Sequence, residues 1–215
     1  MAFEPVRAAE ACIRRSRRFL ALANGTLPDS KIKNDLRRSA VVTVVAGIDS
    51  YMHWIVYKRL SELRGKGDLP KAFSKLDIPF TELASLADSV VAARSRNVHS
   101  RPWAKVKNTL HQRLLKETFQ SYDQVATAFA LAGIEKGWTR VAAEMGMQPA
   151  EIKVRLGGIV HRRNQIVHEA DISRSSRLRQ PKYNLIRHAK VEADVDWVEF
   201  VIQSTEKVLN ASNPP

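Results

Sequence analysis

The chain has 215 residues, and its 35 lysines and arginines outnumber its 22 aspartates and glutamates, so the formal net charge is +13. Apolar residues make up 44% of the chain, which excludes a wholly disordered protein, and a single cysteine, Cys12, excludes an intrachain disulfide or a multi-thiolate zinc site. The positive charge favours nucleic acid as a partner, because neutralised phosphates release counterions; a basic surface without a specific ligand is the alternative.

Apolar residues recur at intervals of three and four along most of the chain, which predicts an all-α protein without a sheet. The first helix is expected over residues 5–23, because proline is favoured in the first turn of a helix. The second is expected over residues 29–63 and is unusually long. A loop rich in turn-forming residues follows at 64–79.

The helical pattern continues to the C-terminal end. Further helices are expected from about residue 81 to a point before Pro102, and over 103–132, 139–145, 149–169 and 191–210. Residues 172–190 contain six lysines and arginines and no acid, which predicts a flexible basic loop. Since no repeat or strong linker divides the chain, we expect residues 1–215 to form one helical bundle domain.

The location of the protein is predicted from the same composition. A lone cysteine fits a reducing compartment, and the N-terminal residues lack the apolar core of a signal peptide. The longest apolar run, AVVTVVAGI at residues 40–48, is too short to span a bilayer. We therefore expect a cytoplasmic protein with no membrane partner.

Residues 161–171, HRRNQIVHEAD, end the helix predicted at 149–169. They place Arg163 five residues before His168, with Asn164 one helical turn before His168. The spacing alone is weak evidence, since it also joins Arg94 to His99, where we interpret it as a basic helix terminus.

Helix geometry limits what one copy of this motif is expected to do. Arg163 lies about 140° around the helix from His168, so one helix is not expected to close both tightly on a small substrate. Two copies packed about a two-fold axis would present both residues to a shared cleft, which predicts a homodimer. His161 and His168 are about 10.5 Å apart along the axis, too far to share a metal ion, and we expect no metal and no cofactor.

Other charged residues are candidates for support or for RNA contact. Asp49 interrupts an apolar run, and it must be partnered or near the surface, because burying a lone carboxylate is costly. Asp49 either faces solvent where helices cross or orients Arg163 or His168, and we predict the orienting role. The predicted RNA contacts are Arg14, Arg17 and Arg18 on one face of the first helix, Arg162 beside the motif, and Arg174, Arg177, Arg179 and Lys182 in the basic loop.

Residues 140–156, RVAAEMGMQPAEIKVRL, support a different interpretation. They place Ala142, Gly146 and Ile152 at the spacing of a helix-turn-helix, with Arg155 pointing outward, so a DNA-binding regulator is an alternative. Against it, the second helix continues for another dozen residues, and paired helices are common in any bundle. A helical adaptor with neither RNA turnover nor DNA affinity is a third possibility.

Two stretches, SAVVTVVAGIDSYMHWIVYKRL and LGGIVHRRNQIVHEAD, together resemble the HEPN superfamily and in particular its RiboL-PSP branch. The family motif is an arginine, four to six residues and a histidine, often with a polar residue directly after the arginine; here these are Arg163, His168 and Asn164. The resemblance covers about residues 10–208. It implies a helical bundle that dimerises with its two motifs facing each other, metal-independent endoribonuclease activity, and a role as a toxin or in anti-phage defence, sometimes beside a cognate antitoxin.

The chemistry of these residue types agrees with that expectation. RNA carries its own nucleophile, the 2′-hydroxyl, so cleavage needs proton transfer and charge stabilisation but no metal. An imidazole, whose ordinary pKa is about 6.5, suits general acid or base work, the role predicted for His168. Arg163 would bind the scissile phosphate and Asn164 would orient the ring or hold a phosphate oxygen. The expected products carry 2′,3′-cyclic phosphate and 5′-hydroxyl ends.

Overall fold

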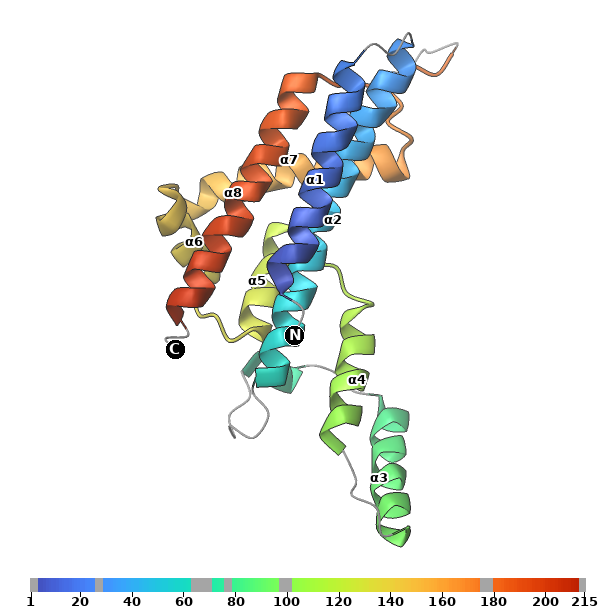
Figure 1. Ribbon diagram of the computed structural model, residues 1–215, viewed down its shortest axis with the longest axis vertical. Helices are drawn as coiled ribbons and strands as arrows, with labels where there is room; N and C mark the ends of the chain where they lie inside the picture. The colour runs from blue at the N-terminus through green and yellow to red at the C-terminus, as the bar shows by residue number, and fades with distance from the viewer. Residues whose placement is uncertain are drawn as a thin grey trace.

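The helical periodicity of the sequence is confirmed by the computed structural model, which describes residues 4–25, 29–62, 71–75, 79–96, 102–174 and 180–212. Within these ranges the protein has eight α-helices and, in place of a sheet, one isolated β-bridge. Helices α1 (Pro5–Asn24), α2 (Ser30–Glu62) and α8 (His188–Ser212) pack against one another and form the long axis of the molecule (Figure 1).

Close contact between α1 and α2 depends on small side chains. A β-carbon at Gly47 of α2 would lie 3.1 Å from Cβ of Cys12, which is tighter than ordinary van der Waals contact. Ser16 of α1 is fully buried, and its hydroxyl donates a hydrogen bond to the Ala40 carbonyl of α2 at 3.1 Å. The buried hydroxyl is thus satisfied within the interface, as burial requires.

The long second helix is confirmed as α2. By length and composition α2 could cross a membrane, but 56% of its most apolar window is buried inside the protein. The core helix of a globular protein has the same properties, and α2 packs against α1, α8 and α7 (Pro149–His168). Its apolar length is explained by this central position.

One predicted helix, over residues 103–132, is wrong. The structure has α4 (Pro102–Leu114) and α5 (Tyr122–Leu131), separated by a connection in which Phe119 is buried. Ser121 begins α5 through a capping box: its hydroxyl accepts from the Gln124 N–H, and the Gln124 side chain accepts from the Ser121 N–H. Such a box marks a helix start, and its Ser-x-x-Gln signal was present in the sequence.

Helices α3 (Phe80–Ser95) and α4 extend away from the three long helices as an arm (Figure 1). None of the α3 side chains is buried. Arg94 lies in the last turn of α3 as predicted, whereas His99 lies outside the described residues. A short 3-10 helix, η1 (Lys71–Lys75), packs against α5.

Helix α6 (Gly137–Met145) leads through a tight turn into α7, which crosses α2 (Figure 1). Gly146 ends α6 with a φ of +65°, a left-handed conformation that glycine adopts without a steric penalty. Pro149 then opens α7 as predicted.

The segment predicted as a flexible basic loop is anchored at its base. Ile172 and Tyr183 form the antiparallel bridge, in which the Ser173 N–H donates to the Lys182 carbonyl at 2.7 Å and the Asn184 N–H donates to the Asp171 carbonyl at 2.9 Å. Backbone hydrogen bonds therefore order the two ends of this segment. Residues 175–179 lie outside the described residues.

A glycine-to-alanine substitution tests the packing of α6. A β-carbon at Gly137 would lie 2.3 Å from Cδ2 of the buried Phe129 ring. We expect Gly137→Ala to lower the free energy of unfolding by about 1–3 kcal/mol, because the ring or the helix must shift, as measured by urea titration. Gly25→Ala is the control, since its β-carbon would meet the Leu22 carbonyl at an ordinary 3.4 Å. Equal stabilities of the two variants would contradict this packing.

Candidate functional site

The motif residues lie at the C-terminal end of α7. The helix ends at His168, and the Glu169 N–H still donates to the Gln165 carbonyl. Ala170 and Asp171 then adopt left-handed φ values of 51° and 56°, so the chain turns sharply away from the helix axis. The motif is thus placed on the last two turns of a helix, beside a sharp bend.

Arg163 and His168 contact each other within one chain. Nη1 of Arg163 lies 3.5 Å from Nε2 of His168 and donates to Oδ1 of Asn164 at 3.0 Å. One helix therefore brings the two side chains into contact, although their backbone positions lie about 140° apart around it. The backbone geometry separates the two β-carbons, but the arginine side chain is long enough to reach the face that carries the histidine.

The contact directs a hydrogen-bond donor at the ring. A guanidinium carries only donors, so the tautomer of His168 that has a free lone pair on Nε2 can accept from Arg163. His168 and Asn164 are exposed, and Arg163 is half-buried. A proton acceptor, a cation and an amide are therefore accessible together from solvent.

A buried carboxylate, Asp171, fixes the bend that follows the motif. It is fully buried and accepts from Nε of Arg38 at 2.6 Å, from both Nη atoms of Arg162 and from Nδ2 of Asn184 at 3.1 Å. Arg38 belongs to α2, Arg162 to α7 and Asn184 to the segment before α8. One side chain therefore ties three segments of the chain together where the motif ends.

The Asp171 network was not predicted from the sequence. Arg162 was predicted to contact RNA, but its guanidinium is bonded to Asp171 and its side chain is only 22% exposed. Arg38 and Asp171 are 133 residues apart, so no local pattern joins them. The sequence feature that could have indicated a role for Asp171 is its position at the end of the stretch HRRNQIVHEAD.

Asp49 does not orient the motif, which corrects the sequence prediction. Its carboxylate accepts from the Phe119 N–H at 2.6 Å and from Nε2 of Gln120 at 3.0 Å. It also lies 3.6 Å from Nε2 of His53, whose pKa is lowered by burial although Asp49 acts in the opposite direction. The expectation that Asp49 needs partners is confirmed, but these partners belong to the connection between α4 and α5.

Several of the remaining predicted RNA contacts already pair with acids. Arg17 pairs with Asp196 at 2.8 Å and with Glu199 at 2.5 Å, both on α8, and the Arg14 guanidinium lies 3.5 Å from Glu10. Arg174 pairs with Glu169, which directly follows α7, and Arg18 of α1 and Lys182 are exposed. Arg177 and Arg179 lie outside the described residues.

The two helices and the turn of the predicted helix-turn-helix are present as α6, residues 146–148 and α7. However, Arg155 does not point freely outward. Its Nη2 donates to the Ala193 carbonyl at 3.1 Å, and its guanidinium lies 5.0 Å from the centroid of the Trp197 ring. The side chain that a DNA-binding role would use is thus already in contact with α8.

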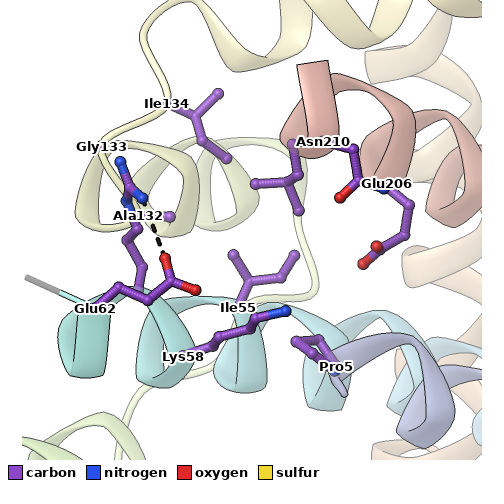
Figure 2. Close-up of a pocket in the computed structure, with 11 residues that line it drawn as sticks. Pro5, Ile55, Lys58, Glu62, Ala132, Gly133, Ile134, Glu206 and Asn210 are labelled. Carbon is purple, nitrogen blue, oxygen red and sulfur yellow. Dashed lines mark hydrogen bonds and ion pairs between the residues drawn. The ribbon is translucent and has the colours of Figure 1, made fainter. Parts of the chain in front are cut away.

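A separate cavity of about 130 Å³ lies between α2, the turn before α6 and α8 (Figure 2). Its lining includes Pro5, Ile55, Ile134 and Glu206. Lys58 reaches Glu4 at 2.8 Å, and this hydrogen bond raises the pKa of Lys58 and lowers that of Glu4. Arg59 and Glu62 pair at 3.1 Å. Because these charges neutralise one another, the motif on α7 is the better candidate for chemistry.

Metal ligation has no candidate in the part of the chain that the structure describes, where no three histidine, cysteine, aspartate or glutamate side chains gather suitably. Comparison of the chain with protein-family models, curated proteins and solved structures finds no match. The functional assignment therefore starts from the geometry of Arg163, Asn164 and His168.

Replacing Asp171 tests whether its network holds the end of α7. Asp171→Asn removes the counter-charge of Arg162 and leaves Arg38 with only the exposed Asp35 at 3.0 Å, so we expect the free energy of unfolding to fall by about 3–5 kcal/mol in urea titrations. Asp196→Asn is the matched control, because this carboxylate is 59% exposed and its loss should cost less than about 1 kcal/mol. Similar losses in both variants would show that Asp171 is not a structural anchor.

Proposed function

We propose that this chain is a metal-independent endoribonuclease of the HEPN type, with Arg163 and His168 as its reacting pair. The observation that carries the proposal is the 3.5 Å contact between the guanidinium and Nε2 of the imidazole at an accessible helix end. Together with the family resemblance of the surrounding sequence, this contact favours a nuclease over a DNA-binding regulator whose key arginine is engaged.

Each motif residue has a definite role in the proposed reaction. Nε2 of His168 takes the proton of the 2′-hydroxyl as the 2′-oxygen attacks phosphorus. The bond between phosphorus and the 5′-oxygen breaks, and the 5′-oxygen leaves as a hydroxyl with a proton from solvent water, while the protonated His168 returns its proton to solvent. Arg163 binds the phosphate and offsets its developing charge, while Asn164 holds the guanidinium in place.

The proposed biological role rests on the family resemblance. We propose that the enzyme acts in the cytoplasm as a toxin or an anti-phage effector, and that a cognate antitoxin or defence partner restrains it. The net charge of +13 fits RNA as the substrate, since phosphate neutralisation supplies sequence-independent affinity.

Two substitutions test the assignment of the pair. We expect Arg163→Ala and His168→Ala each to lower the rate of RNA cleavage in excess chelator by about 100-fold or more, because one loses charge stabilisation and the other proton transfer. Arg94→Ala, which removes the exposed arginine of the other Arg-x4-His spacing, should retain the wild-type rate.

The products distinguish this chemistry from metal-dependent hydrolysis. Cleaved ends should carry 2′,3′-cyclic phosphate and 5′-hydroxyl groups, and a substrate with deoxyribose at the scissile position should remain intact. Undiminished cleavage by both motif variants, or cutting of the deoxy substrate, would refute the proposal.

A homodimer is supported by the exposed face of α7. Gly157 is exposed, and a β-carbon at this position would meet nothing within 4 Å. A glycine within a helix costs about 0.5–1 kcal/mol relative to alanine, and packing within the chain does not require this one. We propose that a second copy of α7 crosses at this point, where the missing side chain allows a close approach, with the two motifs in one assembly.

A bulkier, uncharged residue at the crossing tests the dimer. We expect Gly157→Gln to raise the dimer dissociation constant at least tenfold in sedimentation experiments, while the isolated subunit becomes more stable by about 0.5 kcal/mol because glutamine favours helix. Ala143→Gln, on the exposed face of α6, should change neither association nor cleavage. A wild-type protein that stays monomeric at micromolar concentration would contradict the dimer.

A further inference from the structure

A groove of about 480 Å³ runs between α7 and the segment that leads into α8. Its apolar lining includes Val154, Gly158, Leu185 and Ile186. Val154 and Leu185 are 76% and 75% exposed, which is unusual for side chains of this size that line a concave surface. Part of the groove is therefore suited to covering by a ligand with an apolar face.

The rim of the groove is cationic. Arg155, Arg162, Arg187 and Lys190 line it. Arg155 contacts the Trp197 ring, Arg162 is bonded to Asp171, and Lys190 pairs at 2.6 Å with Asp194, the one acid of the lining. Within the described residues, Arg187 is therefore the cation of the rim that no acid or ring engages. Such a rim is complementary to an anionic ligand. A second copy of this chain would bring like charge to the groove, because its own net charge is +13.

The groove lies next to the motif along α7. Arg162 and Gln165 line it, whereas their sequence neighbours Arg163 and Asn164 lie on the adjoining faces of the helix, outside it. His161, also in the lining, lies about 10.5 Å along the helix axis from His168. A strand with its scissile phosphate at the motif would therefore extend into the groove.

We propose that this groove binds a nucleotide of single-stranded RNA that flanks the scissile phosphate. The base packs against Val154 and Leu185, and the phosphate lies beside Arg187. A nucleotide combines a flat apolar face with a fixed negative charge, which matches both features of the groove. The strand must be unpaired, because bases in a duplex are stacked inside it. The inference rests on the proposed function only in taking RNA as the ligand.

Binding without cleavage isolates the groove from the catalytic step. A fluorescent 2′-O-methyl oligoribonucleotide cannot be cut by 2′-oxygen attack, and its affinity is measured by anisotropy in the His168→Ala background over a range of salt concentrations. We expect Arg187→Ala to weaken binding about tenfold and to reduce the salt dependence by about 0.7, the contribution of one phosphate contact to a single strand. Arg7→Ala removes an exposed arginine of α1 and serves as the matched control.

A second variant separates apolar contact from charge. We expect Leu185→Gln to weaken binding about fivefold and to leave the salt dependence unchanged, because it removes apolar contact alone. Leu115→Gln is its control, since Leu115 is also exposed, at 57%, but lies after α4. Both substitutions replace an exposed side chain, so the fold should be retained.

Each remaining outcome overturns the inference. Equal losses of RNA affinity in the groove variants and their controls would indicate general charge or surface effects. If the groove variants lose no affinity, or if the protein binds no RNA, the groove does not bind a nucleotide. Altered dimerisation with unchanged RNA affinity would make the groove a contact between copies. The proposed function can fail independently of the groove. If the wild-type protein never cleaves RNA but the groove variants lose affinity, the proposed function is wrong and RNA binding in the groove is supported. If the groove variants cleave and bind RNA normally, only the groove proposal is wrong.

Discussion

The hydrogen-bonded charge network of Asp171 determines how the C-terminal end of α7 is presented. A carboxylate buried without partners would be very costly, and here four donor groups from Arg38, Arg162 and Asn184 satisfy it. The network joins α2 and α7 to the segment that precedes α8. The same interaction therefore fixes the bend after the motif and one end of the groove, so the motif and the groove have a common structural support.

The distribution of charge distinguishes structural cations from those available to a ligand. On α1, Arg17 faces two acids of α8, and in the Asp171 network two guanidiniums share one carboxylate. Around the end of α7, Arg163 contacts an imidazole and an amide rather than a carboxylate. A cation so placed can exchange its partners for a phosphate, whereas Arg17 would have to break ion pairs. The motif is also at the surface, where a polymer can reach it.

Helix positions were predictable where local sequence determines them. Pro5 and Pro149 each begin the expected helix, because a proline in the first turn loses no hydrogen bond. The break between α4 and α5 was missed although Ser121 and Gln124 form a recognisable capping box, since the apolar pattern continues across it. The break also depends on Asp49, which accepts the Phe119 N–H from a position 70 residues earlier in the chain.

The sequence by itself determined the helical class, the long second helix, the positive charge and the place of Arg163, Asn164 and His168 on one helix end. Periodicity and composition are local or summed properties, so they can be read without coordinates. Only the tertiary structure decided which partner each charged side chain takes: Asp49 with the α4–α5 connection, Arg162 with Asp171, and Arg163 with His168. A long side chain can reach several directions from its backbone position, and the choice among them depends on segments that folding brings together.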